Sequence, residues 1–151
     1  LRINKGESDG VKPMQPVITN NGLVGYVYRV SRNYADILTI IDQNNRVDAI
    51  ITSSRTHGIV EGFSGFQCRL KYVPRNEKVE VGDEVITAGL GNVYPKGIKI
   101  GVVSKVNKEN YGITQSINIE PSVIFKKLEE VLVLFEQDED LQDGEEEDSD
   151  E

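Results

Sequence analysis

His57 and Ser64 are the two residues whose types could support nucleophilic catalysis in this chain. Ser64 stands in the segment GFSG, a glycine-flanked setting that faintly resembles the serine nucleophile of β-barrel hydrolases. Such a hydrolase needs a base, an orienting acid and a nucleophile that converge in space. Ser64 follows His57 by only seven positions, and no acid takes the required place in the chain order. We therefore expect no catalytic residue, and a single histidine cannot build a multi-histidine metal site.

A glycine-punctuated stretch at residues 81–103, VGDEVITAGLGNVYPKGIKIGVV, could in principle cradle a phosphate. A phosphate-binding loop would continue from its last glycine into Lys-Ser or Lys-Thr and then a helix. Here Lys96 and Gly97 lead into alternating apolar residues, the pattern of a strand. We expect no cofactor and a structural loop, whose defining residues are Gly82, Asp83, Thr87, Gly89, Gly91, Pro95, Gly97 and Gly101.

The remaining reactive side chains give little chemistry. Cys68 is the only cysteine, so it can form neither an intrachain disulfide nor a cysteine-based metal site. It alternates with Leu70 on the apolar face of a predicted strand, where a thiol acts as a small hydrophobic group. Asp83 and Glu84 are adjacent on a turn and strand, so their carboxylates point to opposite faces. The sequence predicts no metal site and no enzyme.

Charge divides the chain into two parts. Residues 136–151 carry eleven acidic residues and no basic one, whereas residues 1–135 carry 14 acidic and 17 basic residues. The segment 136–151 has too little apolar content to offset the entropy of ordering, so we expect a disordered tail. It could be an arm for a basic surface or a solubilising tail. Lys126-Lys127 is the only adjacent basic pair in the body, which argues against a nucleic-acid partner.

About ten short apolar runs with period-two alternation, separated by turn residues, predict an all-β protein. One of these strands carries Val24, Tyr26, Tyr28 and Val30 on the same face. The polar segment 52–58 divides the strands, so we expect two small barrels. The expected divisions are a frayed start that is the remnant of an upstream helix at 1–12, a first barrel at 13–55, a second at 56–121, a closing turn and strand at 122–135 that could complete the first barrel, and the tail at 136–151.

Six segments in one unbroken order resemble the rod shape-determining protein MreC family. Each segment alone is a weak signal, but their order across residues 13–135 is specific. They are NGLVGYV at 21–27, DQNNRV at 42–47, GIVEG at 58–62, VGDEVITAGLG at 81–91, YPKGIKIGVV at 94–103, and a Pro…LEEVLV pattern at 121–133. Ala88 stands where the family usually has serine, and the acidic tail lies outside the family pattern.

The resemblance implies two six-stranded β-barrels, arranged as in double-barrel proteases but without catalytic residues. It implies an extracytoplasmic domain held at the bacterial membrane by an N-terminal transmembrane helix that this sequence does not include. It implies a non-enzymatic scaffold of the cell-elongation machinery that organises peptidoglycan synthesis. The implied partners are a class B penicillin-binding protein, MreD and further copies of the chain.

Val93 and Tyr94 are candidate partner-binding residues, because the central loop has no evident reason to expose apolar side chains there. The alternative is that both pack back onto the barrel. Two other functions stay open at this point, a protease-like hydrolase and an oligonucleotide-binding barrel. The second lacks the basic groove and the aromatic platform that single-stranded nucleic acids require.

Overall fold

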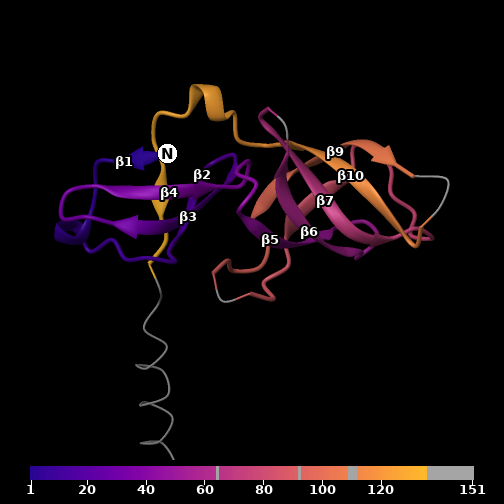
Figure 1. Cartoon of the computed structure of the whole chain (residues 1–151), viewed down its shortest axis with the longest axis horizontal. Helices are drawn as coiled ribbons and strands as arrows, with labels where there is room; N and C mark the ends of the chain where they lie inside the picture. Colours follow the sequence, from indigo (N-terminus) through magenta and orange to yellow (C-terminus); the bar gives the residue numbers. More distant parts are fainter. Residues whose placement is uncertain (64, 92, 109–111, 136–151) are drawn as a thin grey trace, which may run out of the picture.

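The computed structural model describes residues 1–63, 65–91, 93–108 and 112–135. These residues form eleven strands and two short 3₁₀ turns, and no α-helix occurs among them. The all-β prediction is therefore confirmed. Figure 1 shows two lobes side by side, a curled sheet built from the N-terminal strands and a barrel built from the middle of the chain.

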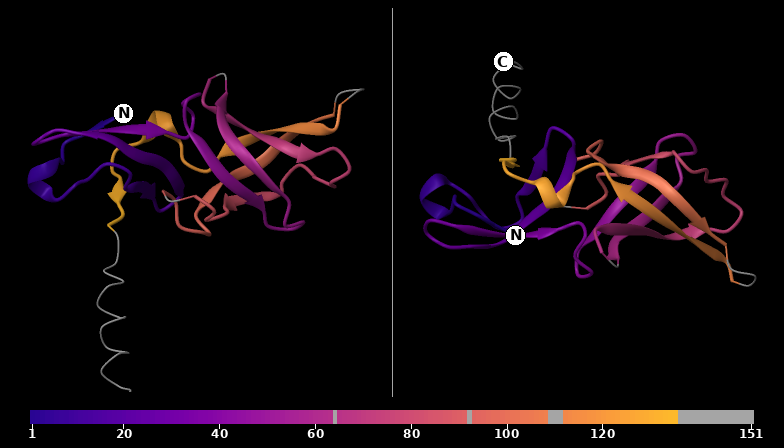
Figure 2. Two further views of the ribbon diagram at one scale, coloured as in Figure 1. Left: turned by 60° about the horizontal axis from the view of Figure 1, so that its bottom comes forward. Right: turned by 90° about the horizontal axis from the view of Figure 1, so that it is seen from above.

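The first lobe, the N-terminal sheet, has five antiparallel strands in the order β1-β4-β3-β2-β11. The C-terminal segment crosses back from the barrel to this lobe (Figure 2), where β11 pairs with β2. The strand bounds are β1 Arg2–Ile3, β2 Pro16–Thr19, β3 Gly22–Val30, β4 Ala35–Thr39 and β11 Leu132–Val133.

The second lobe is a closed six-stranded barrel in the order β10-β7-β6-β5-β8-β9. All its neighbouring strands are antiparallel. Their bounds are β5 Arg46–Ile51, β6 His57–Phe63, β7 Gln67–Pro74, β8 Glu84–Thr87, β9 Lys99–Asn107 and β10 Thr114–Pro121.

The expectation of two six-stranded barrels is met by the second lobe only. Within the described residues, the N-terminal sheet has five strands, and its edge strands β1 and β11 do not pair with each other. Each of these edge strands is only two residues long. The sheet therefore curls without closing.

The predicted division at residues 55 and 56 is wrong, because β5 belongs to the closed barrel. β5 pairs with β6 on one side and with β8 on the other, and Val47, Ala49 and Ile51 are buried in the barrel core. The polar segment 52–58 includes the tight turn between β5 and β6, where the Ile51 N–H donates to the Thr56 carbonyl. The chain changes sheet at residues 40–45 instead.

The expectation of a frayed start at residues 1–12 is also wrong. β1 pairs with β4, and the 3₁₀ turn η1 (Glu7–Asp9) donates backbone hydrogen bonds from Glu7 and Ser8 to the carbonyls of Ser31 and Arg32. Val11 is buried in the core of this lobe. Long-range pairing orders a segment whose local sequence carries no periodicity.

Two apolar clusters hold the lobes together. One fills the barrel and includes Leu23 and Ile40 from the N-terminal half, and the other lies under the N-terminal sheet around Val17, Val24 and Val27. Phe125, in the 3₁₀ turn η2 (Phe125–Lys127), packs against both clusters. The lobes are therefore joined through their cores as well as through the chain.

The acidic segment 136–151 lies outside the described residues, as does Ser64. The expectation of a disordered tail stays an expectation.

Candidate interaction site between the two lobes

Thr87, at the end of β8, fixes the shape of the central loop. Its side chain is fully buried, and its hydroxyl donates to the Pro95 carbonyl at 2.6 Å and accepts from the Ile98 N–H at 2.9 Å. Its backbone carbonyl also accepts from the Gly97 N–H at 3.0 Å. One buried residue thus joins both ends of the segment that carries Val93 and Tyr94.

Asp83 organises the turn that enters β8. Its carboxylate accepts from the Glu80 N–H at 2.9 Å, while its own N–H donates to the Glu80 carbonyl. Gly82 lies within this turn with φ +96°, a conformation that favours glycine, and its N–H donates to the Val103 carbonyl. The turn is therefore tied to β9 on the opposite side of the loop.

Two of the predicted loop glycines stand at close approaches, Gly89 in the central loop and Gly101, which the structure places in β9. A Cβ on Gly89, which has φ +72°, would lie 2.7 Å from the Lys96 Cβ. A Cβ on Gly101 would lie 2.1 Å from the Glu120 carbonyl oxygen of β10. Gly91 differs, since its nearest neighbour is the Asp48 carboxylate at 3.6 Å and its φ is not positive.

Tyr94 connects the central loop to the N-terminal sheet. The Asn45 amide nitrogen donates to the Tyr94 hydroxyl at 3.1 Å and to the Leu38 carbonyl of β4 at 3.0 Å. The Tyr94 ring meets the Tyr26 ring edge-on, with centroids 6.1 Å apart. Burial raises the pKa of Tyr94 well above its ordinary value, so the hydroxyl stays protonated and available for the hydrogen bond.

Beside Tyr94, residues from both lobes enclose a cavity of about 260 Å³, which we call the notch. Its volume is below the roughly 300–1,000 Å³ typical of small-molecule pockets, so it suits one inserted side chain. Its lining residues come from four separate segments of the chain and are Met14, Tyr26, Asn44, Asn45, Arg46, Asp48, Gly89, Gly91, Val93 and Tyr94.

Met14 and Val93 give the notch its accessible apolar character. Met14 is 52% exposed and has φ +72°, an uncommon conformation for a residue other than glycine. Its N–H is held by the Val27 carbonyl of β3. Val93 is half-buried on the facing loop. Arg46 and Asp48 add opposite charges among the lining residues, which could orient a partner's polar groups.

The structure separates the two predicted partner-binding residues by role. Tyr94 packs onto the barrel core, which matches the alternative that this side chain is structural. Val93 lines the notch, and its apolar side chain makes no hydrogen bond that would fix it to the barrel. Binding of a partner by Val93 or by Tyr94 stays a prediction.

The residues considered for chemistry do not gather in the described part of the chain. His57 is exposed at the start of β6, and Cys68 is fully buried with its thiol donating to the Ile40 carbonyl at 3.3 Å. Burial raises the pKa of Cys68 to about 12, which keeps the thiol neutral. No group of three or more potential metal ligands occurs among the described residues.

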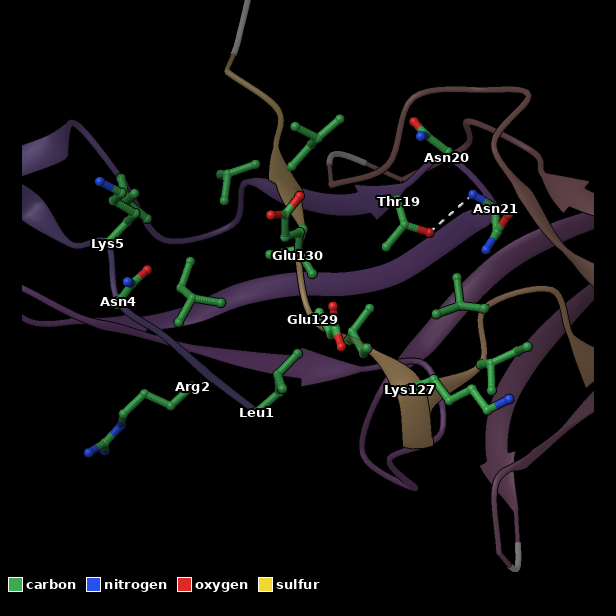
Figure 3. Close-up of a pocket in the computed structure, with 18 of the residues that line it drawn as sticks. Leu1, Arg2, Asn4, Lys5, Thr19, Asn20, Asn21, Lys127, Glu129 and Glu130 are labelled. Atoms are coloured by element: carbon green, nitrogen blue, oxygen red, sulfur yellow. Dashed lines mark hydrogen bonds between the residues drawn. The ribbon is translucent and has the colours of Figure 1, made fainter.

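A second, larger groove of about 1360 Å³ opens between β1 and the C-terminal segment. Figure 3 shows Leu1 on one side and Lys127, Glu129 and Glu130 on the other, with the Arg2 side chain turned away from the groove. Acidic and basic side chains both line it, so its charge favours no particular ligand.

Sequence reasoning missed Asn45 and Met14. The sequence predicts that Asn45 is one residue of a hairpin turn. In the structure Asn45 is only 1% exposed, and its side-chain amide donates hydrogen bonds to Leu38 and Tyr94. No local signal identifies it. Met14 carries a weak one, since it is the only methionine and follows a proline in a polar segment.

These features define an all-β domain in which a curled sheet and a closed barrel enclose the notch. Comparison with known proteins identifies its family. The family model for rod shape-determining protein MreC, barrel core, matches residues 1–135, and the chain belongs to this family.

Individual relatives agree with that assignment. The cell shape-determining protein MreC of Listeria monocytogenes is 37% identical over 139 residues, covering 89% of this chain and 47% of that protein. That of Bacillus subtilis is 32% identical, covering 89% of this chain and 50% of that protein. The crystal structure of MreC from Pseudomonas aeruginosa superposes with a TM-score of 0.85 at 27% identity, covering 89% of this chain and 87% of that one.

The chain therefore spans about half the length of these two sequence relatives. Within the described residues, no helix has the length and apolar character needed to cross a membrane.

Proposed function

We propose that this chain is the extracytoplasmic β domain of a non-enzymatic scaffold in the cell-elongation machinery. The observation that carries the proposal is membership of the MreC family over residues 1–135. The scaffold organises peptidoglycan synthesis by holding cell-wall synthases in place. It is anchored at the membrane by a transmembrane helix that belongs to another part of the protein.

The proposed partners are a class B penicillin-binding protein, MreD and further copies of the chain. Two structural relatives support the first and third of these. MreC of Helicobacter pylori, 16% identical with a TM-score of 0.65, was solved in a complex with penicillin-binding protein PBP2. Another relative is described as the major periplasmic domain of the cell shape-determining filament MreC.

The notch is the proposed docking point for the synthase. Large apolar side chains that enter a pocket at the centre of an interface supply most of its binding free energy. Met14 and Val93 offer such a pocket, and its walls are held by the Thr87 and Asn45 hydrogen bonds. The partner needs one protruding aromatic or aliphatic side chain and polar groups that complement Arg46 and Asp48.

A pull-down of the full chain with the solubilised class B penicillin-binding protein of the same bacterium tests this proposal. Val93→Asp places a charge in the notch, and we expect its affinity to fall about tenfold or more. Val81→Asp is the matched control, because Val81 is 68% exposed and does not line the notch. Circular dichroism verifies that both variants keep their β structure.

Three outcomes separate the scaffold from its docking point. Loss of binding in Val93→Asp alone supports both. Equal binding by Val93→Asp and the native chain retains the scaffold and rejects the notch. If the native chain binds neither the synthase nor MreD nor itself, the scaffold function is contradicted.

A further inference from the structure

Asp36 on β4 holds two arginines on the outside of the N-terminal sheet. Arg2 Nε donates to Asp36 Oδ1 at 2.8 Å, and Arg29 donates to Asp36 Oδ2 from Nε at 3.0 Å and from Nη2 at 2.8 Å. The Asp36 side chain is 7% exposed, whereas those of Arg2 and Arg29 are 58% and 63% exposed. One carboxylate therefore balances one of two positive charges, and both guanidinium groups remain open to solvent.

Two tyrosines fix the orientation of these guanidinium groups. Arg2 lies over the Tyr34 ring at 4.1 Å from its centroid, and Arg29 lies over the Tyr28 ring at 5.6 Å. Tyr28 and Tyr34 are 46% and 38% exposed. We call the surface formed by Arg2, Tyr28, Arg29, Tyr34 and Asp36 the Arg–Tyr face.

A β-bulge produces this arrangement. The pairing of β3 with β4 shifts between Val27 and Arg29, so that Arg29, rather than Tyr28, stands opposite Asp36. The bulge re-aims the side chains that follow it and leaves Tyr28 on the surface. This corrects the sequence-based expectation that Tyr28 shares one face with Val24. Guanidinium groups already held in place lose little rotamer freedom when they bind a carboxylate.

The end of the described chain lies close to the same lobe. Phe135 lies beside Gly10, since a Cβ built on Gly10 would lie 3.7 Å from the Cε1 atom of the Phe135 ring. Gly10 ends η1, and η1 is bonded to the turn that carries Arg32 and precedes Tyr34. The next residues, 136–151, carry eleven acidic side chains and no basic one. Sixteen residues can span up to about 50 Å, so reach does not limit a contact with Arg2 or Arg29.

From this juxtaposition we infer that the acidic segment 136–151 of the chain docks on its own Arg–Tyr face. Carboxylates of the segment form charge-assisted hydrogen bonds with the free guanidinium edges of Arg2 and Arg29, with Arg32 adding a third positive charge nearby. The docked segment shields this face from other acidic chains until a stronger competitor displaces it. The inference is independent of the notch and of the synthase.

A fluorescent peptide with the sequence of residues 136–151 provides the test. Its anisotropy is measured with the native full chain and with a neutral-tail chain, in which every Asp and Glu of 136–151 is replaced by Asn or Gln. We expect the neutral-tail chain to bind the peptide at low salt and to lose it at high salt. We expect the native chain to bind about fivefold or more weakly, because a tethered segment has an effective concentration near the millimolar range.

Substitutions in the neutral-tail chain locate the site. Arg29→Lys keeps the charge beside Asp36 but removes the planar fork, and Arg32→Gln removes an exposed charge from the turn without touching Asp36. Each substitution should weaken binding of the peptide to the neutral-tail chain. Arg69→Lys is the matched control, because the Arg69 guanidinium lies over the Phe63 ring on the barrel, 3.7 Å from its centroid, as that of Arg29 lies over Tyr28. It should leave binding unchanged.

Several results overturn the inference. One is that neither the native chain nor the neutral-tail chain binds the peptide. Another is that both chains bind the peptide equally, because the tethered acidic segment then does not occupy the face. A third is that Arg29→Lys and Arg32→Gln bind the peptide as well as Arg69→Lys does, which would place the site away from the Arg–Tyr face.

Discussion

Asn45 and Tyr94 lie 49 positions apart and meet by a hydrogen bond of 3.1 Å at the boundary between the two lobes. Asn45 also donates to the Leu38 carbonyl, so it connects the central loop of the barrel with β4 of the N-terminal sheet. The pair gives the notch a fixed wall.

Tyr94→Phe should lower the free energy of unfolding by about 1 kcal/mol. The substitution removes the hydroxyl that accepts a hydrogen bond from the buried side-chain amide of Asn45. Urea unfolding followed by circular dichroism measures the change. Tyr72→Phe is the control, since Tyr72 is 60% exposed, and it should stay within about 0.5 kcal/mol. A Tyr94→Phe chain as stable as the control would show that the bond is unimportant.

Thr87→Val should lower the free energy of unfolding by about 2 kcal/mol. The substitution keeps the shape but removes the hydroxyl that donates to Pro95 and accepts from Ile98, which leaves a buried loop connection unmade. Thr87→Ser keeps the hydroxyl and loses one methyl group, so it should cost only about 1 kcal/mol. Urea unfolding compares the two, and a larger loss in Thr87→Ser would contradict the assigned role.

The strands themselves could be predicted from the sequence because their periodicity is local. The alternation at residues 113–119 predicts a strand that the structure places at Thr114–Pro121. The local sequence does not determine which sheet a strand joins. β5 alternates in the same way whether it pairs with β4 or with β6, and only packing of Ala49 and Ile51 in the barrel core decides.

The site could be predicted only in part, for a related reason. The glycines and the Pro95 turn mark the central loop in sequence, and Val93 within it lines the notch. The other wall of the notch comes from Met14 and Asn45, which the fold brings there from distant positions. The Arg–Tyr face depends on a bulge at Tyr28, and regular alternation predicts no bulge.

Cys68 should not react with a thiol reagent in the folded protein. Its side chain is fully buried, and burial together with the charge of Glu120 raises its pKa to about 12, so little thiolate forms at about pH 8. Absorbance with Ellman's reagent should show no reaction in buffer and complete reaction in guanidinium chloride. Ser104→Cys, at an exposed position of β9, should react at once and serves as the positive control. Rapid labelling of Cys68 in buffer would mean that the barrel opens readily.

Asp36 should make the stability of the protein depend on pH in the acid range. Its hydrogen bonds with Arg2 and then with Arg29 lower its pKa from 3.8 to about 2. Because the folded-state pKa is below the unfolded value, the carboxylate stabilises the fold above about pH 4, and this contribution is lost as the pH falls toward 2. The effect should be modest, since both guanidinium groups are largely exposed to solvent.

Asp36→Asn isolates that contribution. The variant should be less stable than the native chain at neutral pH, and the difference between their urea midpoints should shrink as the pH falls from about 4 to about 2. Asp48→Asn removes one carboxylate elsewhere in the molecule and controls for the change in net charge. A difference between Asp36→Asn and the native chain that stays constant across this range would show that the arginines stabilise Asp36 by packing rather than by charge. The Arg–Tyr face would then keep its geometry in acid, and peptide binding by the neutral-tail chain would decline only with protonation of the peptide's own carboxylates.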